Sequence, residues 1–251
     1  MGKTVVFANQ KGGVGKTTTA VNLGACLAEA GRNVLLVDFD PQANTTSGVG
    51  ADGSRPGVYE LLTGKAEARR VVQDTGVAGM KIIPSSIHLT GATVELVDAQ
   101  GREYLLKKAL AGIKPLFDYL FIDCPPSLGL LTLNGLAAAD SVIIPLQCEY
   151  YAMEGLSMLL QTIRRVQAGP NPDLQIGGIL FTMYDSRTRL AHEVVKEVSG
   201  YFKEKVFSTI IPRNVRLSEA PSFGKPISQY DPECIGARSY QKLAEEVLRY
   251  V

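Results

Sequence analysis

Residues 9–18 read Asn9-Gln10-Lys11-Gly12-Gly13-Val14-Gly15-Lys16-Thr17-Thr18, and this stretch decides the fold. It follows a short apolar run at 4–8 and precedes an apolar helical pattern at 17–30. A glycine-rich turn that ends in Gly-Lys-Thr between a strand and a helix is typical of a loop that cradles phosphate groups. The glycines let backbone N–H groups turn inward, and the dipole of the following helix adds positive potential. The stretch therefore predicts an α/β protein that binds a nucleotide.

The loop also supplies side chains suited to a triphosphate. Lys16 would meet the β- and γ-phosphates, and the Thr17 hydroxyl would bind Mg²⁺. Gln10 stands where the common GxxxxGK[ST] pattern has its first glycine, and Lys11 adds a second lysine, which is costly in a phosphate cradle unless it faces an anion. A solvated loop charge is the alternative for Lys11. The residues expected to hold the phosphates are Lys11, Gly12, Gly13, Val14, Gly15, Lys16, Thr17 and Thr18.

Short β-branched runs alternate with longer helical patterns along the chain. The predicted strands are 4–8, 33–37, 81–83, 119–122, 141–144, 176–183 and 206–210. The predicted helices are 17–30, 58–62, 102–113, 131–137, 154–166, 191–202 and 235–250. Alternation of this kind favours a doubly wound, mostly parallel sheet flanked by helices. No Pro/Ser-rich linker divides the chain, so residues 1–251 are expected to form one domain.

Three carboxylates follow predicted parallel strands. Asp38 and Asp40 come at the end of the second strand, on a turn fixed by Pro41, and Asp123 ends the apolar run 119–122. Residues just past such strand ends line the ligand crevice of an open sheet. The first pair could therefore hold Mg²⁺ waters and orient an attacking water, and Asp123 is expected to bind Mg²⁺ through water. An Asx turn is the alternative for the first pair.

Composition limits the function classes. The 251 residues carry 26 Lys and Arg against 25 Asp and Glu, which argues against a globally basic nucleic-acid binder. The four cysteines match no zinc spacing and are expected to be buried thiols. The start of the chain lacks a signal-peptide core and no run of 18 apolar residues occurs, so a cytoplasmic protein is expected.

A local basic patch is still compatible with this charge balance. Over residues 181–225, Lys and Arg outnumber Asp and Glu by eight to five. The loop-like segments of this region contain the arginines Arg187, Arg189, Arg213 and Arg216. A solvated face is the alternative for any one of them. The last helix has Leu243, Val247, Leu248 and Val251 on one stripe and mixed charges opposite, so it is expected to pack on the sheet and not on lipid.

The whole chain resembles the Soj branch of the ParA/MinD group of P-loop ATPases, which have a deviant Walker A loop. The matching motifs are KGGVGKTTT, VNLGACLA, LLVDFDPQ, DCPPSLGLLTLN, QCEYYAMEGL and IIPRNVRLSEAPSFGKPI. The resemblance implies an ATPase that uses ATP and Mg²⁺. It implies that Lys11, Lys16 and Asp40 are catalytic, with Lys11 reaching the nucleotide of a second subunit. It assigns the positioning of the attacking water to Asp40 and a place near the metal to Asp38. It also implies that Pro212, through its backbone, and Asn214, through its amide, read the adenine, where an ordinary polar loop is the alternative.

The resemblance further implies a chromosome-partition switch. ATP would form a homodimer that binds non-specific DNA through residues such as Arg187 and Arg216, and a ParB-type centromere-binding partner would stimulate hydrolysis. The expected location is the cytoplasm, at the nucleoid and away from the membrane. Two alternatives remain open. One is a membrane-associated positioning ATPase of MinD type, and the other is an electron-transfer relative of the nitrogenase iron protein, which needs cysteines placed to share a cluster.

Overall fold

The fold is built on one seven-stranded sheet, seen in a computed structural model that describes residues 2–250. The strand order is β3-β4-β2-β5-β1-β6-β7, so the first strand lies inside the sheet. The strands are β1 Lys3–Phe7, β2 Val34–Asp38, β3 Gln73–Asp74, β4 Met80–Ile83, β5 Tyr119–Asp123, β6 Ser141–Gln147 and β7 Gln175–Thr182. Only the short edge strand β3 pairs antiparallel among the described strands, which confirms the prediction of a mostly parallel, doubly wound sheet.

Helices connect these strands. The α-helices are α1 Lys16–Glu29, α2 Asn44–Gly48, α3 Val58–Leu62, α4 Ala68–Val71, α5 Leu89–Glu95, α6 Leu105–Leu110, α7 Leu130–Ala138, α8 Ala152–Gln167, α9 Arg189–Phe202, α10 Val215–Glu219, α11 Ile227–Tyr230 and α12 Ile235–Tyr250. Short 3₁₀ turns occupy Arg102–Tyr104, Lys114–Leu116, Lys203–Lys205 and Ala220–Phe223. The helix expected over 102–113 is therefore α6 with 3₁₀ turns beside it, and α2, α4, α5, α10 and α11 were not predicted.

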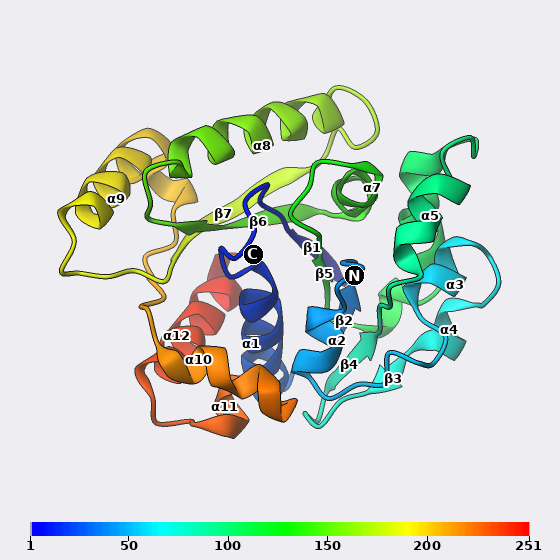
Figure 1. Cartoon of the computed structure of the whole chain (residues 1–251), viewed down its shortest axis with the longest axis horizontal. Coiled ribbons are helices and arrows are strands. Elements are labelled where there is room, and N and C mark those ends of the chain that lie inside the picture. The colour runs from blue at the N-terminus through cyan, green and yellow to red at the C-terminus, as the bar shows by residue number, and fades with distance from the viewer. Residues whose placement is uncertain (1, 251) are drawn as a thin grey trace.

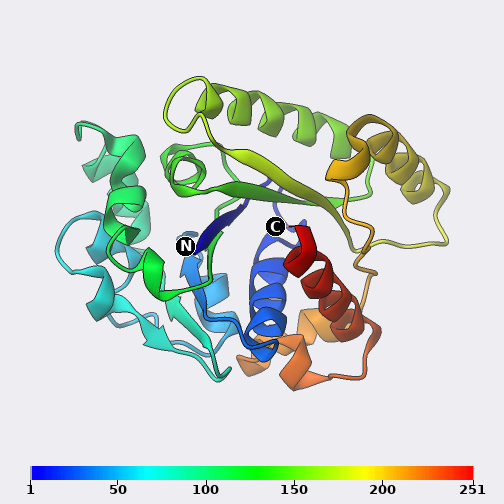
Figure 2. The same cartoon turned by 180° about the vertical axis from the view of Figure 1, so that it is seen from behind.

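The two faces of the sheet carry two hydrophobic cores. Along β1 and the residue after it, Val5 and Phe7 pack with α1 and α12, while Val6 and Ala8 pack with α7 and α8. Side chains alternate across a strand, so a run that is apolar at every position must be covered on both faces. Figure 1 shows α8 and α9 on one side of the sheet and α1 and α12 on the other. The view from behind in Figure 2 again places α1 beside α12.

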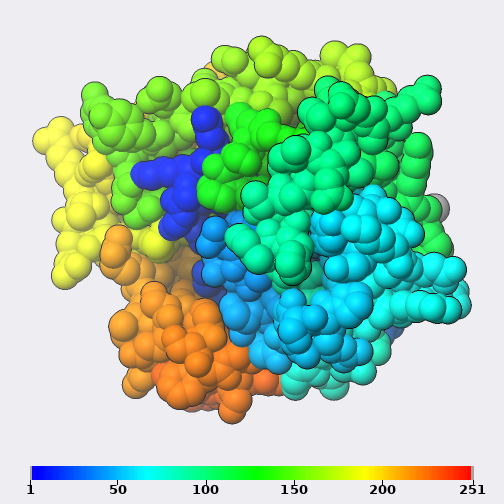
Figure 3. Space-filling model, turned by 45° about the vertical axis from the view of Figure 1, so that its right-hand side comes forward, coloured from blue at the N-terminus to red at the C-terminus, as the bar shows by residue number. Residues whose placement is uncertain are grey.

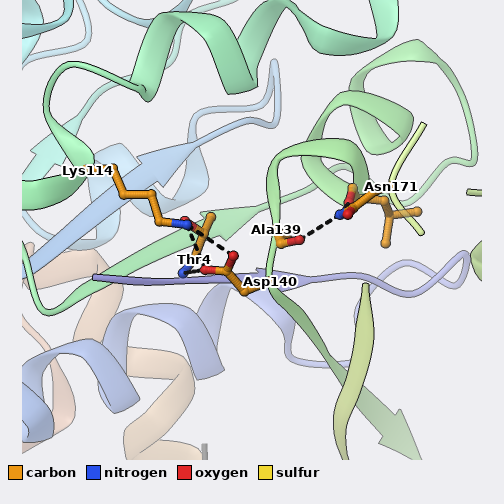
Figure 4. Close-up of polar contacts among 6 residues, drawn as sticks. Thr4, Lys114, Ala139, Asp140 and Asn171 are labelled. Carbon is orange, nitrogen blue, oxygen red and sulfur yellow. Dashed lines mark hydrogen bonds and ion pairs between the residues drawn. The ribbon is translucent and has the colours of Figure 1, made fainter. Parts of the chain in front are cut away.

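The edge of the sheet where the parallel strands begin is held by polar contacts. Asp140 accepts the Thr4 backbone N–H at 2.7 Å and the Lys114 ammonium at 2.7 Å (Figure 4). The buried Asn171 amide donates to the carbonyls of Ala139, at 2.7 Å, and Leu136, at 2.9 Å. These bonds satisfy the carbonyls at the end of α7, which have no partner within the helix. The Thr4–Asp140 bond joins the start of β1 to the residue before β6, away from the end of the sheet where the phosphate loop lies.

The predicted strand at 206–210 is wrong. Val206 makes an isolated bridge to Ile179, and the Phe207 N–H donates to the Ile179 carbonyl at 3.0 Å, but the next two N–H groups do not continue the ladder. Ser208 N–H and Thr209 N–H donate instead to the carboxylate of Glu246 on α12, at 2.7 and 3.0 Å. A charged acceptor therefore takes the backbone donors that a further strand pair would need.

The last helix packs on the protein core, as predicted. Leu243 and Val247 are fully buried on α12, together with Tyr240, whose hydroxyl lies 3.2 Å from Thr19 Oγ1 on α1. Leu248 is 37% exposed, so its assignment to the buried stripe was wrong, and Val251 lies outside the described residues. Within residues 2–250, no helix is both long and apolar enough to cross a membrane.

The four cysteines are free thiols. Cys26, Cys124 and Cys148 are buried and Cys234 is partly buried, which agrees with the expected buried thiols. Burial raises the pKa of Cys26 to about 12, with the nearby Glu29 adding to the shift. Burial also raises the pKa of Cys148 to about 11. Both thiols are therefore protonated near neutral pH and are poor nucleophiles.

Candidate nucleotide-binding site

A cavity of about 570 Å³ opens at the carboxyl end of β1. Its lining comes from the glycine-rich loop, the α2 region and the segment around 211–221, which are far apart in the sequence. In Figure 3 the blue residues of the loop lie at the surface between the light-blue 40–50 and orange 210–225 regions, where the surface is hollowed. The glycine-rich loop, Asp40, Pro212 and Asn214, all expected at one site, therefore meet around one cavity.

The phosphate loop has the backbone that its glycines permit. Gly13 and Gly15 have φ angles of 71° and 85°, in the left-handed region that favours glycine. Gly15 leads directly into α1, so the first N–H groups of the helix face the cavity end of the loop. The hydroxyl of Thr182, at the end of β7, donates to the Val14 carbonyl at 2.8 Å and so holds the loop against β7. The arrangement can bind phosphate oxygens through backbone donors.

Lys16 lies within this loop and lines the cavity. Its ammonium donates to the Lys11 carbonyl at 3.1 Å, and the residue is 6% exposed. Burial lowers the pKa of Lys16, an effect that the charges of Asp123 and Asp40 partly oppose. A buried ammonium gains most from an anion close by, so a phosphate placed in the loop would stabilise its charged form.

Lys11 has a different environment. It is not among the described residues that line the cavity, and its ammonium forms an ion pair with Glu149, beyond the end of β6. The Lys11 backbone N–H donates to Asn9 Oδ1 at 3.0 Å, and Asn9 Nδ2 donates to the Pro145 carbonyl at 2.7 Å. Asn9 thus ties the start of the loop to β6. The role of Lys11 at a second subunit stays a prediction.

A candidate magnesium site lies between α1 and β5. Thr17 Oγ1 and Thr45 Oγ1 both donate to Asp123 Oδ2 at 2.6 Å. The other oxygen, Asp123 Oδ1, is buried without a hydrogen-bond partner. Burial raises the pKa of Asp123 to about 6, despite its bonds from both threonines. An unpartnered buried carboxylate oxygen beside a threonine hydroxyl fits a hard divalent cation, which binds oxygen ligands.

Asp38 lies next to Asp123, and both of its carboxylate oxygens accept hydrogen bonds from the protein. The two residues are opposite each other on β2 and β5. Asp38 Oδ2 accepts Thr46 N–H at 2.8 Å and Thr46 Oγ1 at 2.6 Å, and Oδ1 accepts Asp40 N–H at 3.2 Å. Burial raises the pKa of Asp38 to about 7, and the charge of Asp123 adds to the shift. Asp38 therefore orders the segment after β2, and its expected place near the metal stays a prediction.

Asp40 and the two residues expected at the adenine base, Pro212 and Asn214, all line the cavity. Asp40 is 8% exposed, and its Oδ1 accepts Gln42 N–H at 3.0 Å. Pro212 and Asn214 line the cavity on the segment after β7. Asn214 caps α10, because its Oδ1 accepts Arg216 N–H at 2.9 Å. This bond uses the amide oxygen, so Nδ2 is the group that remains to donate to a base.

The four candidate DNA-binding arginines lie on two segments that the tertiary structure brings together. Tyr184 and Pro212 form a parallel bridge, and Arg213 N–H donates to the Tyr184 carbonyl at 3.0 Å. Arg187 and Arg189 are on the first segment, where they form ion pairs with Asp185 at 2.6 Å and Glu193 at 2.7 Å. On the second segment, Arg213 lines the nucleotide cavity. Arg216 on that segment pairs with Glu219 at 2.9 Å and Asp231 at 3.3 Å.

Several residues of the site were missed by the sequence analysis. They are Asn9, Thr45, Thr46, Glu149 and Thr182. The sequence indicates Thr45 and Thr46, because these two consecutive hydroxyls follow Asp40 closely and a hydroxyl near a carboxylate is a natural donor. Nothing local indicated Glu149, which meets Lys11 across 138 positions of sequence.

A larger hollow of about 1070 Å³ lies between α5, the start of α7 and α8. Its lining is mostly apolar, with Val97, Leu133 and Met158 among its members. The glycine-rich loop and the three aspartates are absent from that lining. We place the candidate site in the smaller cavity, because its lining contains the phosphate-loop residues and Asp40 that a nucleotide needs.

The sheet, the loop after β1 and the Thr17–Asp123 pair define a P-loop nucleoside triphosphatase. Residues 2–176 match the family model described as an AAA domain. The chromosome-partitioning ATPase Soj of Treponema pallidum (strain Nichols) is 65% identical over 248 residues, which cover 99% of this chain and 98% of that protein. The sporulation initiation inhibitor protein Soj of Bacillus subtilis (strain 168) is 57% identical and covers 98% of each chain.

Among solved structures, the chain is similar to cobyrinic acid a,c-diamide synthase from Mycobacterium smegmatis with bound ADP and magnesium. The TM-score is 0.87 and the identity 43%, covering 99% of this chain and 95% of that one. The chain therefore belongs to the Soj/ParA family of chromosome-partitioning ATPases. It is an ATPase of the deviant Walker A type that uses ATP with Mg²⁺. The amide-synthase name belongs to that structure, while the more similar relatives are named as Soj.

Proposed function

We propose that this ATPase is a nucleotide-controlled DNA-binding switch for chromosome partition. One observation carries the proposal: the segment that lines the nucleotide cavity with Pro212, Arg213 and Asn214 continues directly into the exposed Arg216. A change at the nucleotide can therefore act on the basic face without an intervening domain. For the same reason we infer that residues 1–251 work as one domain, since the nucleotide cavity and the basic face share a segment.

We propose the following roles at the nucleotide. The loop residues 11–18 hold the phosphates through backbone N–H groups, and Lys16 adds its ammonium at the β- and γ-phosphates. Thr17 and Asp123 hold Mg²⁺, with Asp38 behind them. The cation, when bound, neutralises charge that develops on the phosphate oxygens. Asp40 orients the attacking water, and phosphoryl transfer needs little more than such positioning. Pro212 and Asn214 read the base.

We further propose that ATP joins two copies of the chain. Lys11 then reaches the phosphates of the partner's nucleotide, which explains why it is absent from the lining of its own cavity. In the dimer two basic faces act on one DNA molecule. Phosphate contacts from Arg187, Arg189, Arg213 and Arg216 add without sequence readout, so binding is non-specific. A ParB-type centromere-binding partner stimulates hydrolysis, and the ATP-bound form gathers at the nucleoid.

DNA retention under different nucleotides tests this function. The measurement is retention of a random duplex with ATP, with ADP and with Lys16→Ala plus ATP, at one fixed salt concentration. We expect the duplex to be retained by the parent chain with ATP, but neither with ADP nor by Lys16→Ala with ATP, because only the triphosphate-bound dimer presents both faces. Lys107→Ala, an exposed lysine on α6, is the matched control for loss of a single charge. Equal retention in all three conditions would remove the switch.

A further inference from the structure

Lys11 and Glu149 come from loops that follow neighbouring strands. Lys11 lies in the loop after β1, and Glu149 comes just after β6, which pairs with β1 in parallel. The two side chains form an ion pair, and Gln147 Nε2 donates to the other carboxylate oxygen, Glu149 Oε1, at 2.5 Å. The carboxylate is thus oriented from one side by an amide and neutralised from the other by the loop lysine.

The Lys11–Glu149 ion pair favours one position of the Lys11 ammonium, but a stronger anion can open it. The Lys11 and Glu149 side chains are 37% and 46% exposed, so water screens their attraction. A pair of this kind shifts an equilibrium by at most about fivefold. A triphosphate carries several negative charges against one on the carboxylate, so it can take the lysine from Glu149. The ion pair therefore favours one lysine position without fixing it.

Two exposed aromatic rings follow Glu149 directly. Tyr150 and Tyr151 are 77% and 64% exposed, and their ring centroids are 5.1 Å apart in an edge-on arrangement. Large exposed aromatic side chains are enriched where proteins bind one another. Because these rings adjoin the acceptor of Lys11, a copy of the chain that draws Lys11 across must approach the same surface.

We propose that Glu149 is a positioning residue that holds Lys11 on its own subunit until the nucleotide of a second copy displaces the carboxylate. The proposal rests on the ATP-dependent dimer proposed above. In the dimer the Lys11–Glu149 pair is open and Tyr150 and Tyr151 are covered by the second copy. Glu149 therefore opposes dimerisation, and it sets how much nucleotide-bound chain is needed before two copies join.

Dimerisation of Glu149→Gln tests this role. Sedimentation equilibrium with a non-hydrolysable ATP analogue and Mg²⁺ gives the dimer Kd for the parent chain and the variant. Each dimer opens two pairs, so the Kd of the variant is expected to fall by about twofold to about thirtyfold. Damage to the fold would weaken dimerisation and cannot produce this result. Gln147→Ala, which leaves the carboxylate less oriented, should shift the Kd in the same direction by a smaller factor.

The matched control is Glu154→Gln, an exposed glutamate on the first turn of α8. It removes the same charge a few residues away and is expected to leave the Kd unchanged. If Glu149→Gln dimerises no more tightly than the parent, or if Glu154→Gln tightens equally, the positioning role is wrong.

Lys11→Ala separates this proposal from the proposed function. Without the lysine, nucleotide-dependent dimerisation should be lost, and adding Glu149→Gln should have no further effect. If Lys11→Ala dimerises as the parent does, the cross-subunit role of Lys11 fails and the proposal on Glu149 fails with it. If Lys11→Ala is monomeric but Glu149→Gln behaves as the parent, only the proposal on Glu149 fails.

A fluorescent reporter tests the covered surface. The chain contains no tryptophan, so Tyr150→Trp introduces a single indole beside Glu149. Its emission should shift to shorter wavelength when the ATP analogue is added, and Lys11→Ala in the same background should abolish the shift. An emission maximum that stays at the solvent-exposed value while sedimentation shows dimer would exclude this surface from the interface.

Discussion

Thr45 donates its hydroxyl proton to Asp123 Oδ2 across 2.6 Å, the same oxygen that accepts from Thr17. Thr45 lies on α2 and Asp123 ends β5, so this bond attaches the short helix after β2 to the candidate metal site. Both residues are buried, with 1% of each exposed. The position of α2 therefore depends on the state of one carboxylate.

Thr45→Val should destabilise the chain. Valine keeps the shape of threonine but removes a donor to a buried carboxylate, which costs about 1.5–3 kcal/mol for a bond to a charged group. Urea unfolding at pH 8, where Asp123 is ionised, measures the loss. Thr93→Val on α5 is the control, because the hydroxyl of this half-buried residue donates to a neutral acceptor, the Thr90 carbonyl of the same helix. A change below about 0.5 kcal/mol for Thr45→Val would contradict the assigned bond.

Asp40→Ala should separate nucleotide binding from hydrolysis. Asp40 lines the cavity, but the hydrogen bonds that hold the phosphate loop and the Thr17–Asp123 pair do not use its side chain. ATP affinity should stay near that of the parent chain, while turnover falls by about a hundredfold or more, as on loss of a positioned acid–base group. Binding of a fluorescent ATP analogue and release of phosphate measure the two properties. Turnover at the parental rate would show that another group orients the water.

Stability without Mg²⁺ should fall as pH rises. The pKa of Asp38 is about 7 in the folded chain against 3.8 for an ordinary aspartate, so the folded state keeps a proton that the unfolded state has lost. The unfolding free energy therefore decreases between about pH 4 and pH 7, by up to about 1.4 kcal/mol per unit from this residue, and then levels.

Asp38→Asn isolates that contribution. The variant cannot titrate at this position, so its unfolding free energy should decline less steeply over the same pH range. Urea unfolding of both chains at several pH values between 4 and 8, with a chelator present, gives the two slopes. Any constant offset from altered bonds to Thr46 cancels in the comparison. Parallel curves would mean that Asp38 titrates normally.

Arg187→Ala and Arg216→Ala should weaken DNA binding equally on every sequence. Each arginine that contacts a phosphate contributes about 0.9 to the slope of log affinity against log salt. The slope, measured with an ATP analogue on two unrelated duplexes, should therefore decrease in magnitude with each substitution. Lys107→Ala on α6 should leave it unchanged. A loss of affinity confined to one of the duplexes would instead indicate base readout.

The sequence by itself determined the class and the architecture. A glycine-rich turn between a strand and a helix has few stable arrangements, so residues 9–18 already placed a phosphate loop after β1. The apolar runs before Asp38 and Asp123 required buried parallel strands, which bring their carboxyl ends to one edge of the sheet. The predicted strand at 206–210 was wrong because its apolar and β-branched pattern indicated burial but not which acceptor would take its N–H groups.

Only the tertiary structure decided how the polar groups are paired. It gave the N–H groups of Ser208 and Thr209 to Glu246, the Asp38 carboxylate to Thr46, and the Lys11 ammonium to Glu149. Periodicity records which side of an element is buried, and that information is local. A hydrogen bond or ion pair depends on where two distant segments meet, and Lys11 and Glu149 meet only because β1 and β6 lie side by side in the sheet.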